Sequence, residues 1–349
     1  MKALCYTRPL GIGDLEAALE MQDVPVPEPG QGELLVRMHA SSINIDDIHV
    51  AEGTFLGGMS ASRASVEKPT TPGVDVAGVV EKVGPGTTGF AIGEKVLGIL
   101  SPKPGPGAWA EHSCLPVKMA LKIPQGFSFQ DAAAVCIGGK TAANAVASSE
   151  LLSGQTAVVV GASGGIGSIV VQSLKNLGVR VIGVCSGRNA ALVGSLGAET
   201  VVDYNRGPFG EQLADMKENI DAVIDCVGGL DIEQQGLLVL EKSSRFVTIV
   251  GPHKFIGETR LGWSGILGYL AYVGRRSLFS KFSGPRYLLA GLNSSLAPLE
   301  KLVLQNNIKP PIEREVSLEV EAVREAVAHV RSHRASGKVV ITIADSYEA

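Results

Sequence analysis

TAVVVGASGGIGSIVVQSLKNL, residues 156–177, contains a strand, a glycine-rich turn and a helix in immediate succession. Ala157 to Val160 are apolar and mostly β-branched, as expected of a strand that is buried on both faces. From Ile166 to Leu177 the apolar residues recur with helical spacing. Such a unit typically binds a dinucleotide, because a diphosphate sits on the N–H groups at the helix N-terminus and glycines leave room for it.

The turn itself reads G-A-S-G-G-I-G and departs slightly from the usual G-x-G-x-x-G pattern, because Ala162 takes the place of its first glycine. A glycine pattern alone is weak evidence, and a tight strand-to-helix turn in another α/β protein would look similar. Its position between this strand and this helix favours a nucleotide site. The predicted contacts are Ala162, Ser163, Gly164, Gly165, Ile166 and Gly167.

The composition of the 349-residue chain indicates two domains and a small-molecule partner. With 45% hydrophobic residues, the chain holds more apolar material than one ordinary core needs. The net charge is −4, and no block of lysines or arginines marks a surface for a phosphate backbone. We therefore expect no nucleic-acid partner.

The five cysteines are scattered, and no two have C-x-x-C spacing. This pattern favours reduced thiols over a disulfide framework or a cysteine-rich zinc site. The N-terminal sequence MKALCYTRPL lacks the apolar core of a signal peptide and the Arg- and Ser-rich character of a transit peptide. Both observations predict a cytoplasmic protein, with a presequence already removed as the alternative.

The order of expected elements predicts the domain boundaries. Residues 1–122 contain short strands broken by Pro- and Gly-rich loops, which indicates a small β-barrel-type domain. Over residues 123–309, strands and helices alternate, which indicates a parallel, doubly wound α/β sheet. Its strands are expected at 156–160, 179–184, 200–203, 220–225 and 245–250. Residues 310–349 contain a strand, an amphipathic helix and a strand, and we expect them to complete the first domain.

The sequence leaves alternative roles for two segments, residues 53–71 and 261–274. Residues 53–71 are polar and small without a period, which predicts a surface loop that either borders the active site or is an ordinary insertion. LGWSGILGYLAYVG, residues 261–274, is too short to span a bilayer, so we expect no membrane span. We place it over the pocket or at a subunit contact. The neighbouring Arg260, Arg275 and Arg276 leave a membrane-surface role as the alternative.

Several motifs, spread from one end of the chain to the other, resemble those of the quinone oxidoreductase-like branch of the medium-chain dehydrogenase/reductase superfamily. They are INIDDIHVAEG (43–53), TPGVDVAGVVEKVG (71–84), GAWAEHSCLP (107–116), GASGGIGSIVVQ (161–172), SLGAETVVDY (195–204), DAVIDCVGG (221–229) and SGKVVITI (336–343). The resemblance implies a GroES-like catalytic domain and a Rossmann domain with the active site between them. It also implies reduction of quinones or activated alkenes, generally with NADPH, and we expect a homodimer.

The same resemblance implies that this chain lacks the catalytic zinc of related alcohol dehydrogenases. In the alignment, the zinc-ligand positions of those enzymes fall on Asn44, Val74 and Ile137. None of these side chains offers a thiolate or an imidazole, the groups on which zinc sites depend. The four close cysteines of the structural-zinc loop are also missing from the sequence. A different metal site would have to use residues whose spacing matches no known pattern, namely His39, Asp47, His49 and His112.

The residues after the second Rossmann strand favour NADPH. An NAD-binding unit usually has an Asp or Glu about 20 residues past the glycines, where it accepts from the ribose 2′-OH. Here the sequence VIGVCSGRN places Ser186 and Arg188 in that region, and a guanidinium can pair with a 2′-phosphate. In related reductases a tyrosine at the place of Tyr204 also faces this phosphate. The alternative for these residues is a solvated arginine and a half-buried core tyrosine.

Asn44, Asp47 and His49 are the candidate catalytic residues, placed at the active-site end of the first domain by the resemblance. The amide of Asn44 could donate to the substrate oxygen or to the nicotinamide, and Asp47 could support it. His49 stands where many relatives have tyrosine, so it could be a proton donor, a ribose contact or a structural residue. In the second domain we expect further cofactor contacts at Thr141, Val227, Val250 and Gly251.

Hydride transfer to a conjugated acceptor is the favoured reaction. A quinone or an α,β-unsaturated carbonyl spreads the incoming negative charge onto oxygen, so that positioning and hydrogen-bond donors suffice without a Lewis acid. One alternative is an enoyl-thioester reductase. The other is a non-catalytic NADPH-binding sensor or scaffold.

Overall fold

The computed structural model describes residues 1–54, 64–101, 105–254, 257–290 and 295–343. The chain divides into two compact units. The first comprises Met1–Ile137, Gly257–Trp263 and Ile312–Ala349, and the second comprises Gly138–Ile256 and Ser264–Pro311.

The first unit extends past the predicted boundary at residue 122 because the beginning of helix α3 (Phe129–Ser149) is attached to it. The ring of Phe129 stacks on His39 with centroids 4.2 Å apart. At the end of this stretch, the backbone N–H of Ile137 donates to the carboxylate of Asp75 over 3.0 Å. The predicted boundary lies at residue 122, between a strand and a helix, whereas the units divide after Ile137, within helix α3.

Within the described residues, the first unit is built on a seven-stranded, mainly antiparallel sheet. Its order is β14-β15-β3-β4-β5-β7, with β6 paired to β3. The strands are β3 (Glu33–Ile43), β4 (Asp75–Val83), β5 (Lys95–Ile99), β6 (His112–Pro116), β7 (Ala120–Lys122), β14 (Ile312–Ser317) and β15 (Lys338–Thr342). Because β15 pairs with β3, the C-terminal segment completes this unit. A two-stranded sheet of β1 (Lys2–Cys5) and β2 (Glu20–Asp23) accompanies it.

The two larger apolar clusters found among the described residues of the first unit lie on its main sheet and beneath its helices. One contains Leu34, Val36 and Met38, alternate residues of β3 that share a face, as the period of two in a strand requires. The other joins β15 to three helices, namely α1 (Leu15–Ala18), α2 (Ile45–Ala51) and α10 (Val320–Arg331). The stripe of α10 that enters this cluster contains Val323, Ala326 and Val327, spaced as one helical face.

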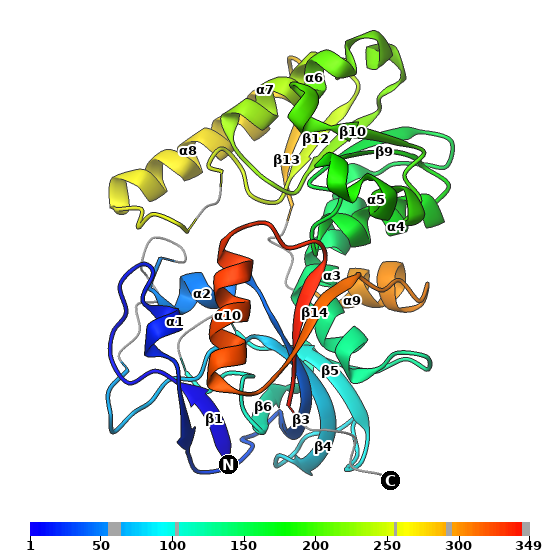
Figure 1. Cartoon of the computed structure of the whole chain (residues 1–349). Helices are drawn as coiled ribbons and strands as arrows, with labels where there is room; N and C mark the ends of the chain where they lie inside the picture. Colours follow the sequence, from blue (N-terminus) through cyan, green and yellow to red (C-terminus); the bar gives the residue numbers. More distant parts are fainter. Residues whose placement is uncertain (55–63, 102–104, 255–256, 291–294, 344–349) are drawn as a thin grey trace. The chain divides into compact units, whose positions relative to one another are not determined.

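The second unit contains, among its described residues, a six-stranded parallel sheet in the order β10-β9-β8-β11-β12-β13 (Figure 1). Its strands are β8 (Thr156–Val160), β9 (Arg180–Cys185), β10 (Thr200–Asp203), β11 (Ala222–Asp225), β12 (Arg245–Thr248) and β13 (Arg286–Leu289). This order reverses between β8 and β11, where a doubly wound sheet binds its ligand. The predicted α/β fold class is confirmed, whereas β13 was not predicted.

Helices cover this parallel sheet. Helix α4 (Gly167–Asn176) packs on β8 and β9, and α5 (Ala190–Ser195) packs on β9 and β10. An apolar cluster of the second unit brings α6 (Phe209–Gln212) and α7 (Leu230–Leu238) against β10, β11 and β12. Residues 261–274 largely become α8 (Trp263–Phe279), a helix that extends beyond the edge of the sheet (Figure 1). Within the predicted 53–71 loop, residues 55–63 lie outside the described residues.

Candidate cofactor site and catalytic residues

The glycine turn brings α4 against β8 so closely that a side chain is excluded. Gly161 has a φ of +77°, in the left-handed region that glycine tolerates. A Cβ atom on Gly167 would lie 2.2 Å from the carbonyl oxygen of Gly161, which is far inside van der Waals contact. Helix α4 therefore follows the turn closely, and the N–H groups of Ser168 and Ile169 in its first turn donate to the carbonyls of Gly164 and Ile166.

Hydrogen bonds divide the turn into an anchored part and a part that faces outward. The N–H groups of Gly161 and Ala162 both donate to Val184 of β9, over 3.0 and 3.1 Å. The Ala162 side chain is fully buried, so this predicted contact residue offers neither its side chain nor its N–H to a ligand. The other predicted residues of the turn are better placed: Gly165, Ile166 and Gly167 lie at the N-terminus of α4.

Three of the predicted residues meet at the carboxyl ends of β9 and β10. Ser186 precedes a short 3-10 helix, Gly187–Asn189, that contains Arg188. The amide of Asn189 donates to the Ser163 hydroxyl over 3.0 Å, which attaches this helix to the glycine turn. Tyr204 directly follows β10 and is 56% exposed. The paired strand ends thus bring Ser186, Arg188 and Tyr204 to the same edge of the sheet.

An additional carboxylate, which the sequence reasoning missed, also lies at this edge. Asp203 pairs with Cys185 in the sheet, and a Cβ atom on Gly187 would be 2.4 Å from its Oδ2. The N–H of Asn205 donates to Asp203 over 3.0 Å, and this bond is the first cause of its lowered pKa, with the backbone of Gly187 and the charge of Arg206 adding to it. Strand register was the missing signal, because only the paired strands place Asp203 beside this loop.

Asp225 and Thr248 position the loops that carry Val227, Val250 and Gly251. Asp225 ends β11, is 1% exposed and accepts from the N–H groups of Val227 and Gly228, both over 2.9 Å. The Thr248 hydroxyl donates to Asp225 over 2.8 Å and accepts from the N–H of Gly251 over 2.9 Å. Burial raises the pKa of Asp225, and these donors oppose that effect. A single buried carboxylate therefore holds two strand-end loops, a role that the sequence reasoning did not assign.

Thr141 lies on α3, three residues after Gly138 and thus on a similar face of the helix. The position of a Cβ atom on Gly138 is 3.7 Å from the Gly165 carbonyl oxygen and 4.0 Å from the Ile166 side chain. This packing brings the predicted Thr141 toward the N-terminal end of α4 within the second unit.

In the first unit, Asn44 lies at the centre of a buried polar network. Its side-chain N–H groups donate to Asp75 over 2.9 Å and to Asp47 over 3.2 Å. Its oxygen accepts from the ammonium of Lys338, a residue only 6% exposed, and Ser42 donates to the same Asp75 carboxylate. A direct hydrogen bond from this amide to a substrate would require one of these bonds to break. The geometry therefore favours a positioning role for Asn44, and the sequence reasoning missed Asp75 and Lys338.

Asp47 is a buried acid with one oxygen that has no hydrogen-bond partner among the described residues. Its Oδ2 accepts from the N–H of Asn44, the N-cap residue of α2, over 2.7 Å. Its Oδ1 is unpartnered and buried, and Asp47 lines a cavity of about 20 Å³, a size suited to one water. Burial, followed by the nearby Asp75 carboxylate, raises the pKa of Asp47 to about 8. Asp47 is accordingly protonated at neutral pH.

His49 is also buried, but its electrostatics differ from those of Asp47. Burial first, and then the positive charges of His333 and Arg331, lower the pKa of His49 to about 4. Gly257 packs directly on the ring, since a Cβ atom there would lie 2.2 Å from Nδ1. His49 is therefore neutral at physiological pH. It does not carry the imidazolium proton that a general acid would donate.

The positions that correspond to zinc ligands hold no thiolate or imidazole in this chain. Asn44 is engaged in the network above, Val74 is 5% exposed, and Ile137 contributes its backbone N–H to Asp75. Across the described parts of the chain, no three His, Cys, Asp or Glu side chains come together in a way that could hold a metal ion. The five cysteines are free thiols.

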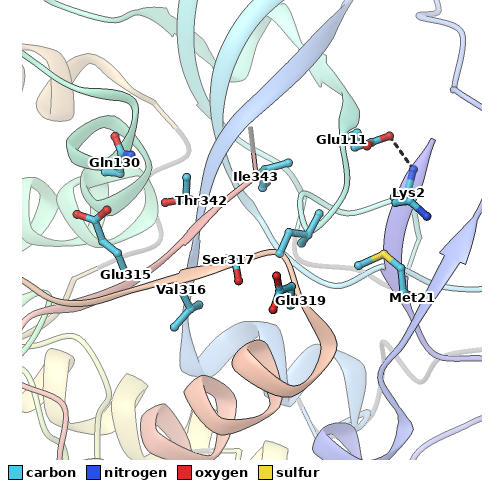
Figure 2. A pocket seen from close by; sticks show the side chains of 11 residues that line it. Lys2, Met21, Glu111, Gln130, Glu315, Val316, Ser317, Glu319, Thr342 and Ile343 are labelled. Carbon is cyan, nitrogen blue, oxygen red and sulfur yellow. Dashed lines mark hydrogen bonds between the residues drawn. The ribbon is translucent and has the colours of Figure 1, made fainter. Parts of the chain in front are cut away.

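The large hollow of the first unit lies elsewhere. Its volume is about 560 Å³, and Figure 2 shows charged and polar side chains around it, including Glu315 and Glu319. The bond between the Lys2 backbone N–H and Glu111 lies at its margin, with a length of 2.7 Å. None of the predicted site residues lines this hollow.

Comparison with known proteins places the chain in a family. Residues 30–125 match the alcohol dehydrogenase GroES-like domain, and residues 196–341 match the zinc-binding dehydrogenase domain. The chain is 31% identical over 329 residues to the mitochondrial NAD(P)H oxidoreductase RTN4IP1 of Mus musculus, covering 89% of this chain and 82% of that protein. The chain belongs to the medium-chain dehydrogenase/reductase superfamily, in its quinone oxidoreductase-like branch. The predicted resemblance is confirmed, and the protein is an NAD(P)H-dependent oxidoreductase.

Two further members of the superfamily are similar along their length. The chloroplastic NADPH-dependent alkenal/one oxidoreductase of Arabidopsis thaliana is 26% identical over 348 residues, covering 98% of this chain and 79% of that protein. The solved quinone oxidoreductase from Coxiella burnetii is 25% identical with a TM-score of 0.77, covering 99% of both chains. Among the helices of the described residues, none has the length and apolarity that a bilayer span requires.

Proposed function

We propose that this oxidoreductase transfers hydride from NADPH to a quinone or an α,β-unsaturated carbonyl, without a metal ion. The observation that carries the proposal is the identity of the residues at the zinc-ligand positions. An amide, an isopropyl group and a sec-butyl group stand there, on Asn44, Val74 and Ile137, and none is a usual zinc donor. The similarity to a quinone oxidoreductase and to an alkenal/one oxidoreductase supports this class of acceptor.

The second unit supplies the residues that would bind NADPH. The N-terminus of α4 would hold the diphosphate, and Arg188 would pair with the 2′-phosphate. Asp203 would not repel that phosphate strongly, because its charge is engaged by the N–H of Asn205 and by Arg206, whose Nε is 3.9 Å away. Asp225 and Thr248 would fix the loops of Val227 and Gly251 against the cofactor. NADPH, when bound, supplies the hydride.

The first unit would supply the proton, from Asp47, whose raised pKa keeps its carboxyl group protonated. Asp47 is neutral at pH 7 and would hold its proton on Oδ1, the oxygen that has no hydrogen-bond partner among the described residues. Asn44 and Lys338 both contact the other carboxylate of the network, that of Asp75. Asp47 is therefore a better candidate than His49 to donate the proton that the enolate or hydroquinone anion takes up after hydride transfer. His49 would act as a neutral packing and hydrogen-bonding residue.

Loss of NADPH absorbance on mixing with 9,10-phenanthrenequinone, and separately with an α,β-enone, tests the proposal. We expect turnover of at least one acceptor by the purified enzyme. NADPH binding without turnover of either acceptor, or of an enoyl thioester, would instead indicate the sensor or scaffold alternative. The homodimer and the cytoplasmic location remain predictions, which light scattering and cell fractionation check.

A further inference from the structure

Helix α8 exposes an apolar stripe along its length. The structure buries none of its residues completely. The side chains that point outward include Trp263, Leu267, Leu270 and Leu278, which are 72%, 64%, 59% and 55% exposed. Their spacing places them on one face of the helix, and Phe282 continues the patch beyond its end with 83% exposure. A contiguous apolar patch of this kind usually marks a binding surface.

The opposite face of α8 binds the second unit through hydrogen bonds. The apolar stripe therefore points away from that unit. The Tyr269 hydroxyl donates to the Val250 carbonyl over 3.0 Å. Tyr272 and Arg276 both bind the buried carboxylate of Glu233, over 3.0 and 2.7 Å. These bonds use the polar groups of the inner face and leave the apolar residues on the outside.

The stretch of sequence that contains this stripe carries charges of one sign. In a chain with a net charge of −4, no Asp or Glu occurs from Thr259 to Leu299. The same stretch contains five basic residues, of which Arg260, Arg275, Lys281 and Arg286 are exposed, and Arg260 donates to the Glu52 carbonyl over 3.0 Å. Arg276 is neutralised by Glu233. An apolar stripe with tryptophan and phenylalanine at its ends and cations beside it matches the chemistry of an anionic lipid interface.

We propose that α8 lies on the surface of an anionic bilayer, with the face of Trp263, Leu267, Leu270 and Leu278 inserted among the acyl chains. This inference rests on the proposed function, because it would place the enzyme where lipophilic quinones dissolve. A second copy of the chain suits the surface less well, since a two-fold interface would bring this face, with its unbalanced cations, against itself. The 17 residues of α8 lie along the interface and do not cross it.

Co-sedimentation with vesicles tests this surface. One vesicle type is phosphatidylcholine alone, and the other is an equal mixture of phosphatidylcholine and phosphatidylglycerol. We expect the wild-type protein to bind the anionic vesicles more than about tenfold better. The double variant Leu267→Glu/Leu270→Glu and the variant Arg275→Glu/Lys281→Glu should each lose that binding by about tenfold or more. Leu152→Glu is the matched control, since this leucine is 71% exposed and lies away from α8.

Three results would overturn the proposal: no binding of the wild type, undiminished binding of Leu267→Glu/Leu270→Glu, or conversion of a wild-type dimer to a monomer by that double variant. Reduction of the water-soluble quinone 1,4-benzoquinone separates this question from the proposed function. All variants should retain it, which shows that they are folded. Vesicle binding by an enzyme that reduces no quinone would refute the proposed substrate while still supporting the lipid surface.

Discussion

At the scale of single residues, the raised pKa of Asp47 makes stability depend on pH. An unfolded aspartate releases its proton near pH 4, whereas Asp47 keeps it to about pH 8. Between these values the folded state binds the additional proton, so the free energy of unfolding falls as the pH rises. Asp47→Asn cannot ionise and keeps an oxygen for the Asn44 N–H. We expect its free energy of unfolding to fall less between pH 5 and pH 8 than that of the wild type, by about 2–4 kcal/mol.

Urea denaturation at pH 5, 6.5 and 8 measures this difference. Parallel pH profiles for the wild type and Asp47→Asn would show that Asp47 is ionised in the folded protein. Asp47 would then not be the reservoir of the transferred proton.

At the same scale, we expect Arg188 to determine the preference for NADPH over NADH. Arg188→Glu replaces the expected partner of the 2′-phosphate with a repelling charge next to Asp203. We expect the ratio of kcat/KM for NADPH to that for NADH to fall by at least about tenfold. Arg180→Glu makes the same charge change at the amino end of β9, away from this edge, and should leave the ratio unchanged. An unaltered ratio in Arg188→Glu would remove this residue from cofactor recognition.

The sequence suggested site residues where a local motif marks them. It did not suggest residues that reach the site only through the fold. The sequence directed attention to Ser186, Arg188 and Tyr204 from their positions after strands. Asp203 escaped notice because strand pairing brings it to Gly187, and Lys338 escaped because it reaches Asn44 from the other end of the chain. Burial was also invisible: the sequence alone left His49 as a possible acid, while its surroundings keep it neutral.

At the scale of elements, the close packing of α4 on β8 allows the effect of a substitution at Gly167 to be predicted. Gly167→Ala would force a Cβ atom to within 2.2 Å of the Gly161 carbonyl oxygen, so that α4 must move from the strand. We expect the free energy of unfolding to fall by about 1–3 kcal/mol and the Kd for NADPH to rise more than about tenfold. Fluorescence titration and urea denaturation measure both.

Gly194→Ala is the matched control for this change. Gly194 lies in α5, and a Cβ atom there would have no heavy atom within 4 Å. Because alanine favours a helix, this variant should gain up to about 1 kcal/mol and bind NADPH normally. Equal behaviour of the two variants would contradict the close approach at Gly167.

Periodicity located most elements, but the elements with weak patterns were missed. The strand at 156–160 was predicted with its observed bounds, since a run of buried β-branched residues is distinctive. Strand β13 was missed because its four residues follow a glycine- and proline-containing turn and carry little signal of their own. Residues 261–274 were left without a secondary structure, whereas their continuation to Phe279 makes a long helix.

At the scale of the whole molecule, Arg331 ties distant segments of the first unit together. Its Nε donates to Glu16 over 2.6 Å, and its Nη2 donates to Glu52, also over 2.6 Å. Glu52 is only 1% exposed, so Arg331→Met would leave a buried carboxylate without its partner. We expect a loss of about 3–5 kcal/mol in the free energy of unfolding. Arg314→Met, at an exposed position on β14, should change it by less than about 0.5 kcal/mol.

Equal stabilities of these two arginine variants in guanidinium denaturation would show that the ion pairs contribute nothing net. The C-terminal segment would then be held by its apolar residues and by the pairing of β15 with β3 alone. The return of this segment to the first unit was predictable from its strand-helix-strand pattern. The partners of Arg331 were not, because they lie about 300 residues away in the sequence.

The most direct test of metal-free hydride transfer is the fate of deuterium from NADPH that carries deuterium at both C4 positions of the nicotinamide. The enzyme is first dialysed against a chelator and then mixed with labelled NADPH and an α,β-enone, and the product is examined by mass spectrometry. We predict deuterium on the β-carbon of the reduced product, at a rate unaffected by the chelator. Activity that disappears on chelation and returns with zinc, or a product without deuterium, would contradict the account.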